Sequence, residues 1–425
     1  MSYALALLLG ALLHAPAPPA DSTDAPGGAG RSAAGPGVQV QPRFSPLYSA
    51  NYGLGVAVGA TVENAGWAGS EIAVDTRLQV RYQDATVAVF TGDPYHSRVY
   101  GLVAASGSTT GRRRYYGLGP NTLTANELYL SHDAVSVEGR LGVYPFRTSA
   151  LVVQPGLRFL YDRSGGVNGG ASEVPLSALD PASQAAVAVA ADQRRYGLSA
   201  GVEVATDLRD DPEYTRSGTF ASVEARRFAA LDGTGLQLNR LSASATTYVP
   251  LGGRAAVIVR GIGVLTRRLD DDEGDDAIPF FYLPVLGDRV AAGFRQDRLT
   301  GRDLVAVGAG VRLPVLDALG LYGVDALVMG YLGNAYDDVF DQFEPSVSFE
   351  ERAEADGRAP LRPSLALGLS LVDLRAGRTS IGGVLGVGPA RRTGTRRAGR
   401  RATSTGRAPT WSTRGSRSGP RPPTP

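Results

Sequence analysis

Apolar and polar residues alternate one by one over long stretches of this chain, and this alternation limits the folds open to it. In residues 71–82, E-I-A-V-D-T-R-L-Q-V-R-Y, the even positions are apolar apart from Thr76, and the odd positions are polar or charged apart from Ala73. The same period of two recurs in residues 135–143 and 364–371. Because successive side chains of a strand point to opposite sides, each stretch predicts a strand with one apolar face. The repetition predicts an all-β fold.

The composition agrees with strands that span a membrane. No stretch approaches the ~20 continuous apolar residues of a membrane helix. The 55 glycines and 18 tyrosines suit small inward-facing positions and aromatic girdles at the strand ends. A bilayer offers no water to a sheet edge, so strands span it only as a closed barrel. We therefore predict a transmembrane antiparallel β-barrel of about 14 to 16 strands in the bacterial outer membrane. The absence of cysteine excludes disulfides and thiolate metal sites.

The two ends of the chain differ in composition from its centre. A short apolar run at residues 4–13, followed by small residues and prolines, predicts a secretory signal peptide over residues 1–20. Residues 21–45, rich in Gly, Ala, Pro and Ser, predict a disordered linker with no periplasmic module. Residues 46–390 hold the predicted barrel. Residues 391–425 contain ten arginines and no acidic residue, and they predict a disordered tail, whose origin could be a frameshift or a gene-model artefact.

Period-two segments separated by turn residues predict fourteen strands within residues 46–390. The expected ranges are 46–63, 70–82, 84–92, 97–116, 126–146, 149–163, 194–208, 216–229, 236–250, 253–268, 301–315, 318–333, 361–374 and 379–388. Short links contrast with long ones at 164–193, 269–300 and 334–360, which matches the short periplasmic turns and long outer loops of membrane barrels. The alanine-rich run in residues 176–192 predicts a short helix inside its loop.

A polar turn motif, D-L-R-D-D-P-E-Y-T-R-S-G, begins at Asp207. Pro212 fixes its own φ for a turn, and Gly218 can take a positive φ where the next strand starts. The Asp207 carboxylate can pair with Arg209 or Arg216. The motif predicts a charged hairpin turn.

A second motif lies in the long loop that begins with P-F-F-Y-L-P-V-L-G at Pro279 and runs on to Gly293 and Phe294. A guanidinium inside a barrel lumen needs a paired anion, and it binds a carboxylate well. If the loop folds inward, one of its arginines is expected to reach a carboxylate on the inner wall. The candidates are Arg289, Arg295 and Arg298.

A third motif, Y-L-G-N-A-Y-D, includes Gly333, Asn334 and Asp337, and a further segment, Y-Y-G-L-G-P-N-T, occupies residues 115–122. In their order and spacing the four segments resemble the barrel of the bacterial surface antigen superfamily, the BamA/TamA type. The first is similar to the family turn D-x-R-x-x-P-x-x-P-x-x-G, with a threonine in place of the second proline. In this family the long loop folds back into the barrel, and an arginine before its Gly-aromatic pair docks on the inner wall. Ala292 stands at that position here.

The resemblance implies insertion or translocation of proteins at the outer membrane. In that mechanism the seam between the first and last strands opens and pairs with the edge of a client strand. The implied partners are outer-membrane lipid and lipopolysaccharide, client outer-membrane proteins, and a periplasmic subunit that captures clients in place of the transport modules missing from this chain.

Two other functions are consistent with a barrel. One is a passive porin-like channel, whose ion selectivity would be set by lumen charges such as Glu71, Asp75, Arg77 and Arg81. The other is a structural surface barrel that binds through its acidic loops. The loop at 279–301 separates these functions, because a loop docked in the lumen favours the superfamily mechanism and a loop outside an open lumen favours a porin.

The chain shows no pattern of an enzyme. His96 and His132 are expected to be solvated loop histidines, and no G-x-S-x-G elbow, metal-spaced His/Glu pair or phosphate loop occurs. The acidic run at residues 270–276 could bind Ca²⁺ or the divalent ions between lipopolysaccharide head groups, although a solvated loop is favoured. We expect no cofactor. We also expect no nucleic-acid partner, because a secreted barrel meets none.

Overall fold

The structure is a computed structural model, and it divides the chain after Gly388 into two units, the second being Pro389–Pro425. It describes residues 38–387 apart from 50–51, 66–69, 92–97, 146–150, 169–171, 173, 192, 212–213, 270–276, 288–289, 292, 319–321, 350–356 and 374–377. Several features expected from the sequence lie outside the described residues. These are the signal peptide, the linker up to residue 37, the acidic run, the arginine-rich tail, His96, Pro212, Arg289 and Ala292.

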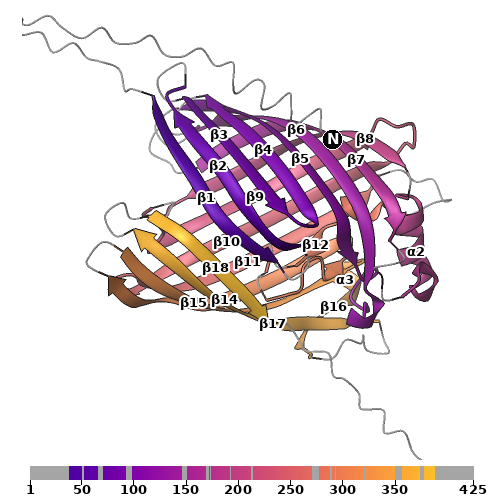
Figure 1. Ribbon diagram of the computed structural model, residues 1–425. Helices are drawn as coiled ribbons and strands as arrows, with labels where there is room; N and C mark the ends of the chain where they lie inside the picture. Colours follow the sequence, from indigo (N-terminus) through magenta and orange to yellow (C-terminus); the bar gives the residue numbers. More distant parts are fainter. Residues whose placement is uncertain are drawn as a thin grey trace, which may run out of the picture. The chain divides into compact units, whose positions relative to one another are not determined.

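One antiparallel sheet forms almost the whole first unit, and each long strand pairs with the next one along the chain (Figure 1). Its strands are β1 (Gln39–Ser49), β2 (Gly53–Glu63), β3 (Ser70–Gln79), β4 (Tyr82–Thr91), β5 (Val99–Tyr115), β6 (Leu128–Val143), β7 (Leu151–Val167), β8 (Arg194–Asp207), β9 (Gly218–Ala230), β10 (Gln237–Gly252), β11 (Ala255–Arg268), β14 (Asp303–Ala318), β15 (Tyr322–Tyr336), β17 (Ala359–Asp373) and β18 (Arg378–Val387). A short strand, β16 (Phe343–Val347), adds to β17 in parallel. Among the described residues, the pairing ends at β1 on one side and at β18 on the other.

The predicted barrel of about 14 to 16 antiparallel strands is confirmed. The predicted strand at 46–63 is wrong, because this segment holds the end of β1 and all of β2, which pair from Gln39 with Glu63 to Ser49 with Gly53. Both halves alternate with the same period, and only Asn51 and Gly53 indicate a turn between them. The sheet therefore begins at Gln39, inside the segment expected to be linker.

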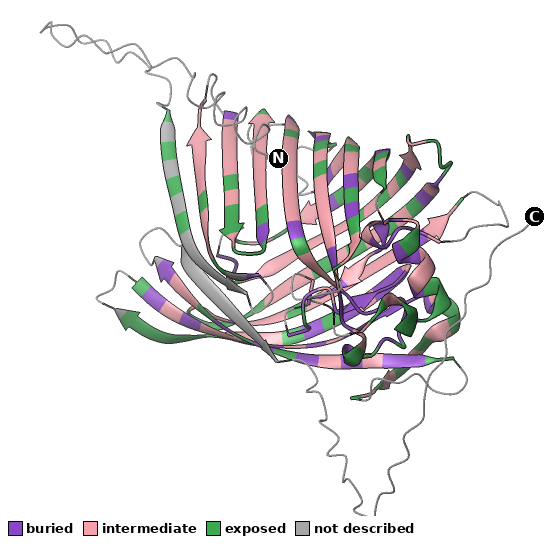
Figure 2. Ribbon diagram, turned by 45° about the vertical axis from the view of Figure 1, so that its right-hand side comes forward, coloured by how far each residue is buried: buried purple, intermediate pink, exposed green. Residues whose placement is uncertain are grey.

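The outer face of the sheet is apolar, which is the pattern expected of strands in contact with lipid. On β6, Val135, Val137 and Leu141 are exposed, whereas Glu138, on the opposite face, is buried. Figure 2 shows exposed residues recurring along the strands in the same alternating way. In water this arrangement would leave a large apolar surface uncovered, so the outward side chains face the hydrocarbon of a bilayer. Among the described residues, no helix is both long and apolar enough to cross a membrane.

The long loops gather at one end of the strands and carry the small elements. The loop after β7 contains the helix α2 (Pro181–Ala188), which confirms the predicted short helix, and the loop after β15 contains α3 (Val339–Gln342). The loop between β11 and β14 contains a two-stranded sheet of β12 (Val285–Leu286) and β13 (Leu299–Thr300). The opposite end has short turns, such as the one at residues 253–254 between β10 and β11. We take the long-loop end as the outer end.

Candidate functional site

The long loop between β11 and β14 is docked against the inner face of the sheet. Phe294 and Leu286 from this loop are buried in one cluster with Met329 and Tyr331 of β15 and with Ala366 of β17. These wall residues occupy the face opposite the exposed Val328 and Leu365. The loop therefore lies in the lumen, as the resemblance to the superfamily implies.

Two glycines permit this docking because a side chain at either position would meet the other partner. Gly293 has a φ of +103°, and a Cβ atom placed on it would lie 2.5 Å from the carbonyl oxygen of Leu365 on β17. Gly333 is on β15, and a Cβ atom there would lie 2.8 Å from a methyl carbon of Leu286. At Gly293 the loop backbone lies so close to the β17 backbone that a side chain there would overlap with it, and at Gly333 a side chain would displace Leu286.

Arg298 fixes the inner loop to the neighbouring loop between β5 and β6. Its guanidinium is buried and donates to the hydroxyl and the carbonyl oxygen of Thr122, both at 2.9 Å. It also lies over the ring of Tyr116, with 5.0 Å between Cζ and the ring centroid. Arg362 of β17 donates to the same Thr122 carbonyl at 3.3 Å and to the carbonyl of Pro120. The acceptors in this contact are one hydroxyl and two backbone carbonyls.

The Y-Y-G-L-G-P-N-T segment also binds the inner loop through its backbone. The backbone N–H of Gly119 donates to the carbonyl of Thr300 at 2.7 Å, and Leu118 forms a parallel bridge with the same residue. Helix α2 supports the segment from the side, because the Ser183 hydroxyl accepts from the N–H of Leu118 at 2.7 Å. Two segments far apart in the sequence form one body inside the loop end of the barrel. We call residues 116–122 and 285–301 together the plug.

The other predicted residues of the plug region have different roles. Arg295 is exposed and takes no place in the buried cluster. Asn334 is buried at the end of β15, where its amide donates to the Pro360 carbonyl at 2.9 Å and joins β15 to β17. Asp337 follows β15, and its backbone N–H donates to the side chain of Gln342 at 2.8 Å.

The turn motif at the opposite end is a compact hairpin, as predicted. Asp207 accepts from Arg209 at 2.8 Å (Nε) and 2.6 Å (Nη2), which selects Arg209 over Arg216 as its partner. Gly218 has a φ of +104° and lies so close to Leu208 that a Cβ atom would be 2.1 Å from its carbonyl oxygen. Burial tends to raise the pKa of Asp210, but three backbone N–H groups bonded to its carboxylate outweigh burial and hold the pKa below its ordinary value.

The same turn sends one side chain into the lumen. Burial and the neighbouring Asp325 carboxylate raise the pKa of Tyr214 to about 12, so its hydroxyl stays protonated and donates to Asp325 on β15. Arg312 lies over the Tyr214 ring at 4.3 Å, and Arg254 pairs with Asp325 at 3.1 Å. The sequence motif contained Tyr214, but nothing local indicated its partners on distant strands.

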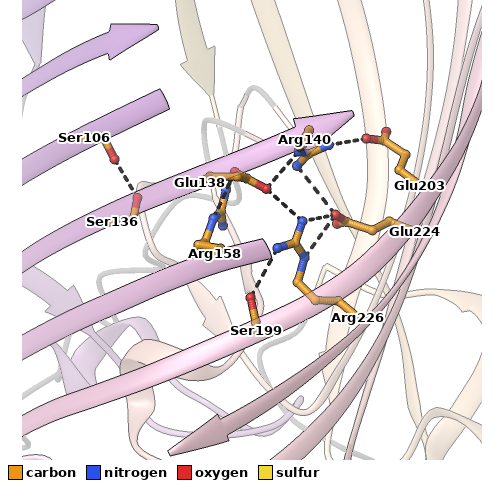
Figure 3. A network of polar contacts seen from close by, with 9 residues as sticks. All are labelled: Ser106, Ser136, Glu138, Arg140, Arg158, Ser199, Glu203, Glu224 and Arg226. Atoms are coloured by element: carbon orange, nitrogen blue, oxygen red, sulfur yellow. Dashed lines mark hydrogen bonds and ion pairs between the residues drawn. The ribbon is translucent and has the colours of Figure 1, made fainter. Parts of the chain in front are cut away.

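A charged network covers the inner wall between the two ends of the lumen. Figure 3 shows arginines and glutamates of β6, β7, β8 and β9 pointing toward one another. Glu138 is at its centre and accepts from Arg140 (2.8 Å), Arg158 (3.0 Å) and Arg226 (2.9 Å). The network is completed by Glu203, which pairs with Arg140, and by Glu224, which pairs with Arg140 and Arg226. Three acids balance three bases. Of these six residues, Glu138 and Arg140 lie in the alternating segment at residues 135–143 that indicated a strand with one polar face.

His132 is not the solvated loop histidine expected from the sequence. It lies within β6 and is mostly buried, with Nε2 3.0 Å from an Asp162 carboxylate oxygen. Its ring stacks on Phe281 of the inner loop at 5.2 Å between centroids. The strand predicted over residues 126–146 includes this position, but nothing near it in the sequence indicates that Phe281 and Asp162 cover the ring.

We expect Arg298→Ala to loosen the plug, because the Thr122 hydroxyl loses its buried donor and the Thr122 carbonyl keeps only the longer bond from Arg362. Loss of a charged hydrogen-bonding partner at a buried site costs about 2–3 kcal/mol. Limited proteolysis of the bilayer-embedded protein should therefore cut the loop at 285–301 several-fold faster. The control is Arg295→Ala, three residues away and exposed, which should leave the rate unchanged. Equal rates in the two variants would contradict the role given to Arg298.

Comparisons with known proteins bear on this fold. Neither the known family models nor the curated protein sequences give a match to this chain. The crystal structure of BamA from Haemophilus ducreyi lacking POTRA domains 1–3 has a TM-score of 0.50 and 13% identity over 81% of this chain and 70% of that chain. CdiB from Escherichia coli has a TM-score of 0.49 and 11% identity, and this chain covers 56% of its length.

The fold is therefore a transmembrane β-barrel of the BamA type. At this level of identity the likeness concerns the fold alone. Barrels of this kind with an apolar outer face belong to outer membranes, so the protein is a bacterial outer-membrane barrel.

Proposed function

We propose that this protein inserts or translocates other proteins at the bacterial outer membrane. The observation that carries the proposal is the plug: buried apolar contacts hold the inner loop on β15 and β17, and Arg298 holds it on the loop between β5 and β6. A passive pore works through an open lumen, whereas a barrel that handles proteins needs a lumen closed to small solutes at rest. The likeness to the BamA fold supports the same function.

The sheet offers a physical basis for handling client strands. Within the described residues, β1 and β18 each pair with one neighbour only, so each presents an edge of backbone N–H and C=O groups. Such an edge can add a strand from another chain. The proposed partners are therefore client outer-membrane proteins, together with a periplasmic subunit that delivers them. The proposal includes no catalytic step.

The charged inner wall keeps a porin-like channel as the second candidate. Glu138 and its arginine partners would give a lumen that water and ions can enter once the plug is absent. Under this alternative the plug would be a gate for solutes, and client proteins would not be affected.

One reconstitution separates the two functions. Liposomes that contain the full chain, or a variant lacking residues 279–300, receive an unfolded outer-membrane barrel diluted from urea. Folding of the client is followed by its altered mobility on unheated gels, and single-channel conductance is recorded in parallel. We expect the full chain to accelerate folding of the client several-fold over empty liposomes and to conduct in small, flickering steps, and the deletion to conduct strongly. Large, steady currents from both chains without any acceleration would support the porin.

A further inference from the structure

The segment after β15 folds over the outside of the barrel. Tyr336 is on the same side of β15 as the exposed Val328, eight residues earlier, so its ring points away from the lumen. It is nevertheless completely buried, in a cluster with Val339 of α3 and Ala359 of β17. Since the cover lies over an outward-facing ring, residues 338–349 form a flap on the outer face at the loop end. Figure 1 shows α3 and β16 beside one end of β17.

The flap is a folded element with a defined seat. Asp303, at the start of β14, is fully buried, and its carboxylate accepts from the N–H of Val339 at 2.9 Å and of Thr266 at 3.2 Å. Asp303 also pairs with Arg267 at 2.5 Å. Asp338 caps α3 by accepting from the N–H of Phe340 at 2.9 Å. These bonds hold the flap on the ends of β11 and β14.

The flap presents apolar side chains outward. Phe340 and Phe349 are 77% and 76% exposed, and Phe343 and Val347 are also exposed. Phe343 pairs with Ala359, and Val347 with Leu361, so both point to the outer side of β17. In water each exposed phenyl ring would leave roughly 100 Å² or more of apolar surface uncovered. A rigid element with such a surface indicates an apolar medium around it.

The position of the flap identifies this medium as lipid. Outward apolar residues run along β14 from Leu313 to Val305, and the eight steps between them cover about 20 Å along the membrane normal at ~3.3 Å per residue and ~40° tilt. An apolar band of about 25 Å is typical of membrane barrels, so Val305 and the flap above it are at its outer boundary. Aromatic side chains concentrate at this boundary.

We propose that the flap is an interfacial anchor whose phenylalanines lie among the lipids of the outer leaflet. Its apolar surface continues the lipid-facing surface of Val307, Val328 and Leu365. Lipid here would fix the end of β17, the strand that carries both the contact with Gly293 and the Arg362 clamp on the plug.

Fluorescence quenching by brominated lipid tests this anchor. The two native tryptophans are replaced by phenylalanine (W67F, W411F), and Phe340→Trp is then introduced as the single probe in the full chain. The protein is refolded into phosphatidylcholine brominated near the carbonyl end of one acyl chain. Leu367→Trp, on the lipid-facing side of β17, is the positive control, and Arg295→Trp in the plug is the negative control.

We expect the Phe340→Trp emission to fall at least two-fold in brominated lipid, close to the fall for Leu367→Trp. Phe349→Trp provides a second probe in case the first variant does not refold, and it should behave alike. Unquenched emission with a water-like spectrum would overturn the proposal. Unquenched but blue-shifted emission would do so too, because it would mean that protein and not lipid covers the flap.

Discussion

Gly293→Val should open the lumen. The backbone of Gly293 combines a φ of +103° with a Cβ position 2.5 Å from the Leu365 carbonyl oxygen and 2.9 Å from the Leu365 nitrogen. A β-branched residue at positive φ costs about 1–3 kcal/mol in backbone strain, and the overlap with the β17 backbone cannot be relieved by rotating a flexible side chain. The plug must therefore leave the wall. Single-channel recording should show a several-fold higher conductance than the parent chain.

A matched control separates the effect of positive φ from the effect of steric overlap with β17. Gly233 also has a positive φ, +81°, but no atom would lie within 4 Å of its added Cβ. Gly233→Val should carry the backbone strain alone and keep the parent conductance. If Gly293→Val conducts like the parent and its plug stays protected from protease, then the close approach to β17 does not hold the plug.

The sequence predicts the strands and the special glycines of this fold much better than it predicts the contacts of the plug. The strand pattern is local, and each strand in a bilayer must expose an apolar face, so the period of two predicted nearly all of the strands. The turn motif predicts a positive φ at Gly218, whereas Gly293 is indicated by its place in the Gly-aromatic pair of the inner loop, and both glycines have a positive φ. In contrast, the partner of Arg298 is 176 residues away in the chain, and no pattern around Arg298 indicates Thr122.

The sequence does not predict the outward flap, for a related reason. It predicts one long loop over residues 334–360, because β16 is only five residues long and pairs in parallel, without the hairpin signal of the other strands. Its exposed phenylalanines are recognisable as an outer surface only after the register of β15 and β17 shows which side faces the lipid. Sequence alone gives the faces of a strand but not which neighbour covers them.

The inner charged network should respond most strongly to the loss of Glu138. Glu138→Gln keeps the size of the side chain, but it removes the negative charge toward which three guanidiniums converge, at 2.8 Å, 3.0 Å and 2.9 Å. Removal of one partner of a buried ion pair costs about 3–5 kcal/mol. Because Arg158 is partly exposed to the lumen, we expect about 2–4 kcal/mol less free energy of unfolding in urea titrations of the bilayer-embedded protein.

Glu203→Gln is the matched control, since it removes the same charge from the same network, and among the described residues Glu203 forms an ion pair with Arg140 alone. This substitution should lower the free energy of unfolding by only about 1 kcal/mol.

In the variant that lacks residues 279–300, both substitutions make the wall more positive, so the reversal potential in a salt gradient should shift toward anion selectivity. The shift should be of similar size for both. Stability and selectivity are thereby separated, because stability depends on how many arginines share the carboxylate, whereas selectivity depends on the net charge of the wall. Equal destabilisation by the two substitutions would mean that the convergence on Glu138 contributes nothing beyond one ion pair. A double-mutant cycle of Glu138→Gln with Arg226→Gln would then show no coupling energy, whereas the observed geometry requires at least about 1 kcal/mol.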